Sequence, residues 1–176
     1  MGPGRVASVA RARVKILASD RERRMKLAEA LAERADLQTR YAQLGARAQQ
    51  SARYQEGEEP AEDAGALLAE MDRVAAQLEA LVVRINIQNL ATEVLPGLSM
   101  TAALARRDTL RRLQKARTDL ADAASTKIDR YARTELRSFA AVDVKTLRDE
   151  ADAYAKEARE LDTLIQGVNW ITEMAE

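Results

Sequence analysis

Apolar residues recur at alternating intervals of four and three positions in two long stretches of the chain. The first stretch comprises Leu67, Met71, Val74, Leu78, Leu81 and Ile85, and the second Leu147, Ala151, Tyr154, Ala158, Leu161, Ile165 and Val168. This spacing places each set on one face of an α-helix. The sequence therefore predicts helices over about 61–92 and about 144–172, each burying one apolar row against partner helices.

Two further helices are predicted over about 25–53 and 101–125. Their inner faces comprise Leu27, Leu31, Leu37, Tyr41, Leu44 and Ala48 in the first, and Leu104, Leu110, Leu113, Leu120 and Ala124 in the second. Gly57 and Pro60 end the first helix, and Pro96 and Gly97 separate the second from the third. Asp143 is a good N-cap for the last helix. The sequence thus predicts an all-α fold, an antiparallel, coiled-coil-like bundle of four long helices.

Residues 126–143 break the helical rhythm. Leu136, Phe139, Ala140 and Val142 suggest an extended or short β-like connection there. The segment is long for a connection between helices, and long ordered loops are often functional.

Residues 1–24 differ from the rest of the chain. They hold seven basic and two acidic residues, a net charge of +5. One interpretation is a basic arm that binds phosphate, and the preferred one is a disordered or weakly helical extension upstream of a natural start at Met25. Residues 25–176 are expected to form a single helical-bundle domain. No apolar signal-peptide core is present around Val14–Leu17, and the expected location is therefore cytoplasmic.

Composition excludes several classes of protein. The chain has no cysteine and no histidine, which excludes disulfides, zinc sites built on those residues and Ser–His–Asp catalysis. The net charge is +0, so bulk charge does not favour nucleic acid. The longest apolar run of the second helix, Ala80–Val83, is too short to span a membrane. Aromatic residues make up only 3% of the chain, so its core must consist mainly of smaller side chains. Cores of this kind are often completed by a second copy of the chain. We therefore expect a homo-oligomer with no cofactor.

Eight polar residues are not needed by the apolar rows and form the candidate ligand site. They are Asn86, Asn89, Arg107, Asp108, Arg130, Arg133, Glu135 and Asn169. Converging Arg and Asn side chains can hold a phosphate or carboxylate through paired hydrogen bonds. The alternative is a buried polar network that fixes the register between helices.

Two charged segments and one aromatic residue also have alternative interpretations. The acidic residues of 56–63 could bind a hard cation, although the preferred interpretation is a solvated turn that favours the N-terminus of the next helix. Basic residues between Arg106 and Arg117 could bind phosphates, but a salt-bridge face fits better because no aromatic residues are interleaved. Trp170 is expected to be a buried anchor at the end of the bundle.

The chain contains several distinctive short motifs: Met25–Leu31, Gln55–Pro60, Ala103–Asp108, Arg130-Tyr131 with Glu135, Val142–Val144, and Glu160–Asp162 with Asn169-Trp170. Together they resemble a family of uncharacterised bacterial proteins labelled septicolysin. The resemblance covers about residues 25–174 and implies an α-helical protein of unknown function.

The sequence itself discloses no biochemical activity. It favours a non-enzymatic, self-associating helical-bundle protein. The alternative is a small-ligand or phosphate-binding protein, or an enzyme, that uses polar residues of the second and third helices and of the 126–143 connection.

Overall fold

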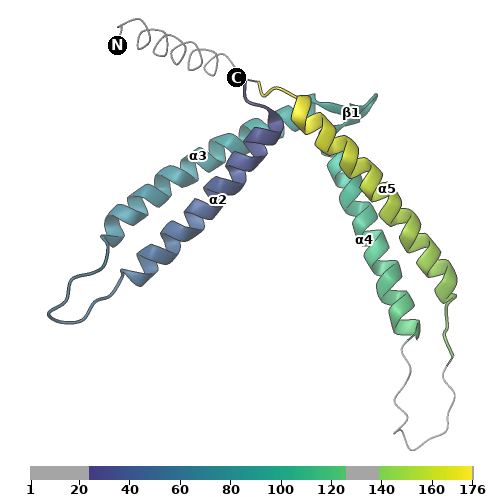
Figure 1. Cartoon of the computed structure of the whole chain (residues 1–176), viewed down its shortest axis with the longest axis horizontal. Coiled ribbons are helices and arrows are strands. Elements are labelled where there is room, and N and C mark those ends of the chain that lie inside the picture. The colour runs from purple at the N-terminus through teal and green to yellow at the C-terminus, as the bar shows by residue number, and fades with distance from the viewer. Residues whose placement is uncertain (1–23, 126–138, 176) are drawn as a thin grey trace, which may run out of the picture. The chain divides into compact units, whose positions relative to one another are not determined.

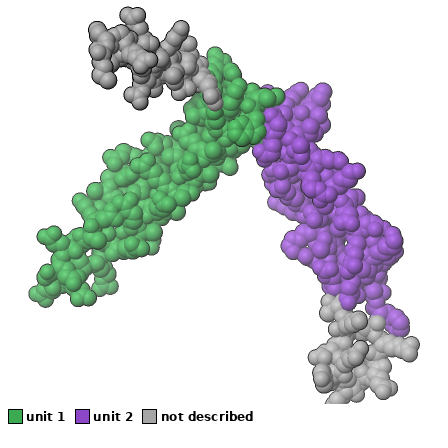
Figure 2. Space-filling view, viewed as in Figure 1, with its two compact units in different colours: residues 1–88, 169–176 green, residues 89–168 purple. Residues whose placement is uncertain are grey.

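The computed structural model describes residues 24–125 and 139–175 (Figure 1). Its elements are α2 (Leu27–Gln50), α3 (Ala64–Ala91), β1 (Glu93–Leu95), β2 (Leu98–Ser99), α4 (Met100–Ser125) and α5 (Val144–Ile171). The all-α prediction with four long helices is confirmed, and the helix bounds differ from the predicted ones by only a few residues. The chain divides into two compact units, residues 1–88 with 169–176 (unit 1) and residues 89–168 (unit 2) (Figure 2).

In unit 1, α2 and α3 run antiparallel and share an apolar core. The predicted row of α3 is the row that is buried, with Leu67, Val74, Leu81 and Ile85 all largely inaccessible. Leu44 and Ala48 of α2 pack with Leu67 and Val74, and the partly buried Leu37 and Met71 complete this cluster. The core of unit 1 is therefore a single layer of side chains between two helices.

The residues that follow α5 close the open end of unit 1. The backbone N–H of Leu27 donates to the carbonyl of Thr172 at 2.9 Å, and that of Met174 donates to the carbonyl of Met25 at 2.8 Å. The Met174 side chain is buried, with 3% of its surface exposed. Lys26 and Glu173 form an ion pair at 2.9 Å on the outside of this closure, and the hydrogen bond from Lys26 lowers the pKa of Glu173.

The expectation that Trp170 is a buried anchor is wrong. Its side chain is 65% exposed, whereas its neighbour Asn169 is only 4% exposed. The buried row of α5 passes through Leu161 and Ile165, and the next position four residues on is Asn169. Trp170 lies about 100° further around the helix and so leaves that row.

Unit 2 begins with a short hairpin. β1 and β2 pair antiparallel, and Pro96 and Gly97 form the turn, in which Gly97 has a φ of 78°. The backbone N–H of Met100 donates to the carbonyl of Thr92 at 2.7 Å, which holds the start of α4 against the residue before β1. The β-like connection predicted at 126–143 is a different segment from this hairpin. Residues 126–138 are outside the described residues, and 139–143 contain no strand.

Helices α4 and α5 form the body of unit 2. Their core residues are Met100, Ala103, Leu110 and Ala121 from α4, with Ala151, Ala158, Leu161 and Ile165 from α5. Alanine supplies half of these positions, so the two helices pack with little side-chain bulk between them. In the part of the chain that the structure describes, no helix is long and apolar enough to cross a membrane.

Asp143 caps α5 as predicted, and this cap makes stability depend on pH. Its carboxylate accepts hydrogen bonds from the Thr146 hydroxyl at 2.8 Å and from the backbone N–H groups of Lys145 and Thr146. The hydrogen bond from the Thr146 side chain, with the backbone bonds, lowers the pKa of Asp143. A lowered folded-state pKa means that the unfolded chain takes up the proton more readily. The stabilisation is therefore present above the ordinary Asp pKa of about 3.9 and is lost as the pH falls through the folded-state value.

Replacing Asp143 with asparagine keeps a capping oxygen but removes the titration. We expect the native protein to be more stable than Asp143→Asn near neutral pH, and this difference to shrink as the pH falls below about 4. Thermal melts of both proteins at a series of pH values measure the difference, and acidic groups elsewhere cancel in the comparison. A difference that stays constant across the series would contradict the prediction.

Candidate functional site

The structure describes five of the eight candidate residues. Asn86 and Asn169 belong to unit 1, and Asn89, Arg107 and Asp108 belong to unit 2. Asn86 and Asp108 are exposed, Asn89 is half-buried, and Asn169 is buried. Arg130, Arg133 and Glu135 lie outside the described residues. A site shared by all eight side chains therefore stays a prediction.

Arg107 is the candidate with the most contacts in unit 2. Its Nη1 donates to Asp162 at 2.9 Å, and its Nε and Nη2 both donate to Asp108, at 3.1 and 3.0 Å. Partial burial acts to lower the pKa of Arg107, but the hydrogen bonds to Asp162 and Asp108 outweigh it, and the pKa is raised. Arg111 also approaches Asp162, at 3.5 Å. All three nitrogens of the Arg107 head group already face carboxylates, so most of its charge is neutralised within unit 2.

The remaining basic residues of α4 follow the same pattern. Arg106 donates to Glu157 of α5 through Nε and Nη2, at 3.1 and 2.8 Å. Arg117 donates to Glu150 at 3.0 Å. Its guanidinium also lies over the ring of Tyr154, 5.6 Å from the ring centre. These contacts join α4 to α5 and partly neutralise the basic face, as the salt-bridge interpretation of this segment predicted.

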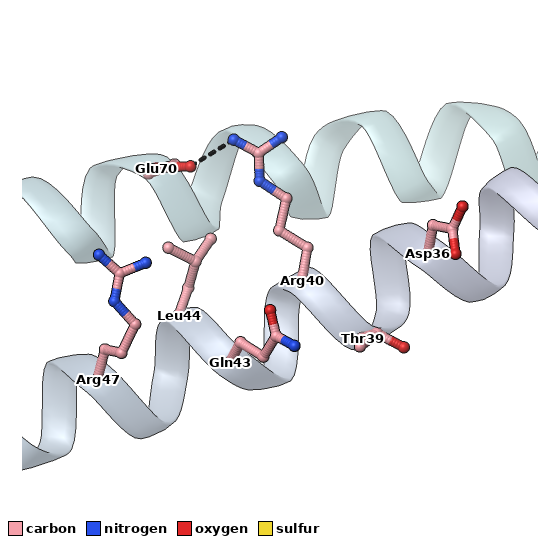
Figure 3. A pocket seen from close by; sticks show the side chains of 7 residues that line it. All are labelled: Asp36, Thr39, Arg40, Gln43, Leu44, Arg47 and Glu70. Carbon is pink, nitrogen blue, oxygen red and sulfur yellow. Dashed lines mark hydrogen bonds and ion pairs between the residues drawn. The ribbon is translucent and has the colours of Figure 1, made fainter.

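Unit 1 contains a shallow polar groove that sequence analysis did not find. It encloses about 390 Å³ and is lined by Asp36, Thr39, Arg40, Gln43, Leu44, Arg47 and Glu70 (Figure 3). Arg40 reaches from α2 to Glu70 of α3 at 2.5 Å, and this hydrogen bond lowers the pKa of Glu70. The sequence signal was weak, because Arg40 and Arg47 lie seven residues apart on one helix, whereas Glu70 lies on another helix and Glu62 in the loop before it.

The chemistry of this groove favours structure over ligand binding. Arg47 makes a two-pronged ion pair with Glu62, in which Nε lies 2.9 Å from Oε2. Both arginines of the groove are thus neutralised by carboxylates of the same unit. Leu44 is the only apolar side chain in the lining, whereas small-molecule sites are lined mostly by apolar groups. The groove therefore contains one ion pair between α2 and α3, that of Arg40 with Glu70, and beside it Arg47 pairs with Glu62 of the loop before α3.

The acidic loop before α3 does not assemble a metal site. Asp63 accepts hydrogen bonds from the backbone N–H groups of Gly65 at 2.8 Å and Ala66 at 3.2 Å, so it caps α3. Glu62 is occupied by Arg47. Across residues 24–125 and 139–175, no group of three or more acidic side chains is placed to hold a metal ion. These contacts agree with the interpretation of the loop as a turn that favours the helix N-terminus.

Comparison with known proteins places the chain in a family. Residues 34–174 match the model of DUF6847, a family of unknown function. The chain belongs to this family. It is also similar to a protein from Corynebacterium diphtheriae whose crystal structure is described as that of a functionally unknown conserved protein. The two chains are 40% identical, the match covers 87% of this chain and 100% of the other, and the TM-score is 0.82. No protein with a curated description matches the chain.

Membership of DUF6847 shows which proteins the chain is related to, but it does not indicate an activity. The family and the similar crystal structure are both described as of unknown function, so the function of this chain is likewise unknown. The resemblance to proteins labelled septicolysin stays a prediction. A functional proposal must therefore rest on the surfaces and contacts of the described residues.

Proposed function

We propose that this DUF6847 protein is a non-enzymatic helical protein that acts by assembling with further copies of itself. The observation that carries the proposal is the set of large apolar side chains left exposed on unit 1. Val83 and Ile87 of α3 are 51% and 58% exposed, and Trp170 and Ile171 at the end of α5 are 65% and 73% exposed. Apolar side chains gathered on a surface usually mark an interface.

The thin architecture of unit 1 supports this proposal. In the described part of unit 1, two helices and a short closing segment cover only one face of each helix, and the buried residues of α3 form a single row. An isolated pair of helices gains much of its stability from further packing. A second copy supplies apolar surface without requiring another type of partner.

The contacts described for the candidate residues give less support to a ligand-binding function. Arg107, Arg40 and Arg47 are the basic groups best placed to bind an anion, and each already faces a carboxylate of its own unit. Pairing of the α4 basic face within the chain likewise gives little support to nucleic-acid binding. We also propose a cytoplasmic location, and this proposal rests on the sequence pattern alone.

Mass measurement in solution tests the proposal. Light scattering coupled to size exclusion, and native mass spectrometry, are expected to give a mass of at least two chains at micromolar concentration. Dilution is expected to shift the mass toward one chain, as for any reversible assembly. A single-chain mass across the micromolar range would contradict the proposal.

A further inference from the structure

Helix α3 carries a second apolar row on the side opposite its core row. We call Ala76, Ala80, Val83 and Ile87 the outer row; their spacing is four, three and four, and the sequence continues it with Leu90. At about 100° per residue, the outer row lies roughly 150° around the helix from Val74, Leu81 and Ile85. All four outer-row residues are exposed. A helix with apolar rows on both sides is typical of one that is covered on both sides.

The outer row has the pattern of a coiled-coil interface. Ala80 and Ile87 take the a positions of a heptad, and Ala76 and Val83 take the d positions. Arg73 occupies the preceding a position, so the apolar row begins at Ala76. β-branched residues at a, such as Ile87, favour two-stranded parallel pairing when Leu is at d, the position of Leu90.

The charges beside the outer row differ between its two flanks. Asp72 and Glu79 take the g positions on one flank, and Gln77 and Arg84 take the e positions on the other. All four side chains are exposed. In a parallel pair, a g residue faces the e residue five positions later in the second helix. Glu79 and Arg84 are separated by five positions, so a parallel pair places opposite charges together on both flanks.

Antiparallel pairing gives the opposite result. A two-fold axis perpendicular to the helices sets each flank against the same flank of the second copy. Glu79 then faces the acidic flank of the second copy, and Arg84 faces its basic flank. Like charges lie together in this arrangement, which is unfavourable. Charge complementarity therefore selects both the partner and its direction.

We propose that two copies pair in parallel along the outer row of α3, with Glu79 of each copy against Arg84 of the other. This inference rests on the proposed self-association and specifies its surface. The occupant of the face is a second copy of this chain, because its own flanks supply the complementary charges in register.

Cysteine cross-linking tests the direction of pairing. The chain has no cysteine, so each introduced thiol reports only on its own position. Full-length Ala80→Cys and Ile87→Cys are each expected to form a disulfide-linked dimer under mild oxidation, because equivalent a positions face each other in a parallel pair. Leu68→Cys, exposed on α3 but outside both rows, is the matched control and is expected not to cross-link. Cross-linking at only one of the two a positions, or equally at Leu68, would overturn parallel pairing.

Charge exchange tests the register. Glu79→Arg and Arg84→Glu are each expected to weaken the dimer by about tenfold in sedimentation equilibrium, and the double variant to recover most of the loss. Single variants with native affinity would overturn the proposed ion pairs. Val83→Ser combined with Ile87→Ser is expected to abolish the dimer, with retention of helical circular dichroism as the folding check.

These outcomes distinguish a failure of the proposed pairing surface from a failure of the proposed self-association. A native protein that is monomeric contradicts both this inference and the proposed function. A native oligomer that the Val83 and Ile87 double variant leaves intact contradicts the outer row alone, and the proposed self-association stands.

Discussion

Leu44→Ala is expected to lower the free energy of unfolding by about 2–5 kcal/mol. Leu44 is 2% exposed and packs with Ala48, Leu67 and Val74 in the core of unit 1. Removing the branched end of its side chain loses the transfer free energy of the buried carbons and leaves a cavity. The core here is one layer of side chains between two helices, so few neighbours are available to fill that cavity.

Leu68→Ala is the matched control for this experiment. It makes the same chemical change on the facing helix of the same unit, but Leu68 is 49% exposed. We expect its effect to be within about 0.5 kcal/mol, as for an ordinary surface substitution. Urea denaturation followed by far-ultraviolet circular dichroism measures both variants at one protein concentration. Equal losses for the two variants would show that Leu44 does not belong to a core.

The helices could be predicted from the sequence because their signals are local. The alternation of four and three fixes which face of α3 is buried, and Gly57 and Pro60 fix where the chain must turn. Asp143 defines the start of α5 through hydrogen bonds to residues only two and three positions later. Each of these features depends on neighbours in the sequence, and each was found in the structure within a few residues of its expected place.

Other features were missed or misinterpreted in the sequence, each for its own physical reason. The short β1–β2 hairpin was interpreted as a simple break, since three- and two-residue strands have no periodicity to read. Asn169, rather than Trp170, is buried because the helical phase of the α5 core row overrides the hydrophobicity of tryptophan. The division into units falls within α3 and α5: no proline or glycine marks it in α3, and the helix continues through Gly167 in α5.

The candidate site was predictable only in part. Composition indicated that Arg107 and the basic residues near it need partners. It did not indicate whether those partners are a ligand or the carboxylates of α5, because Glu157 and Asp162 lie about fifty residues further along the chain. The structure joins Arg107 of α4 to Asp162 of α5, and this ion pair agrees with the alternative interpretation, in which polar residues fix the register between helices.

The second large effect is expected at the closure of unit 1, where Met174→Asp should lower the free energy of unfolding by at least about 3 kcal/mol. Met174 is 3% exposed, and its backbone N–H donates to Met25, so the new carboxylate enters a buried position, while Lys26 of the same closure is already paired with Glu173. Ala175→Asp adds the same charge at the next, exposed position and is expected to have little effect. Urea denaturation compares the two, and hydrogen exchange at Leu27, whose N–H donates to Thr172, reports locally on the closure. Equal stability of the two variants, with protection at Leu27 retained, would show that the closing segment does not stabilise unit 1.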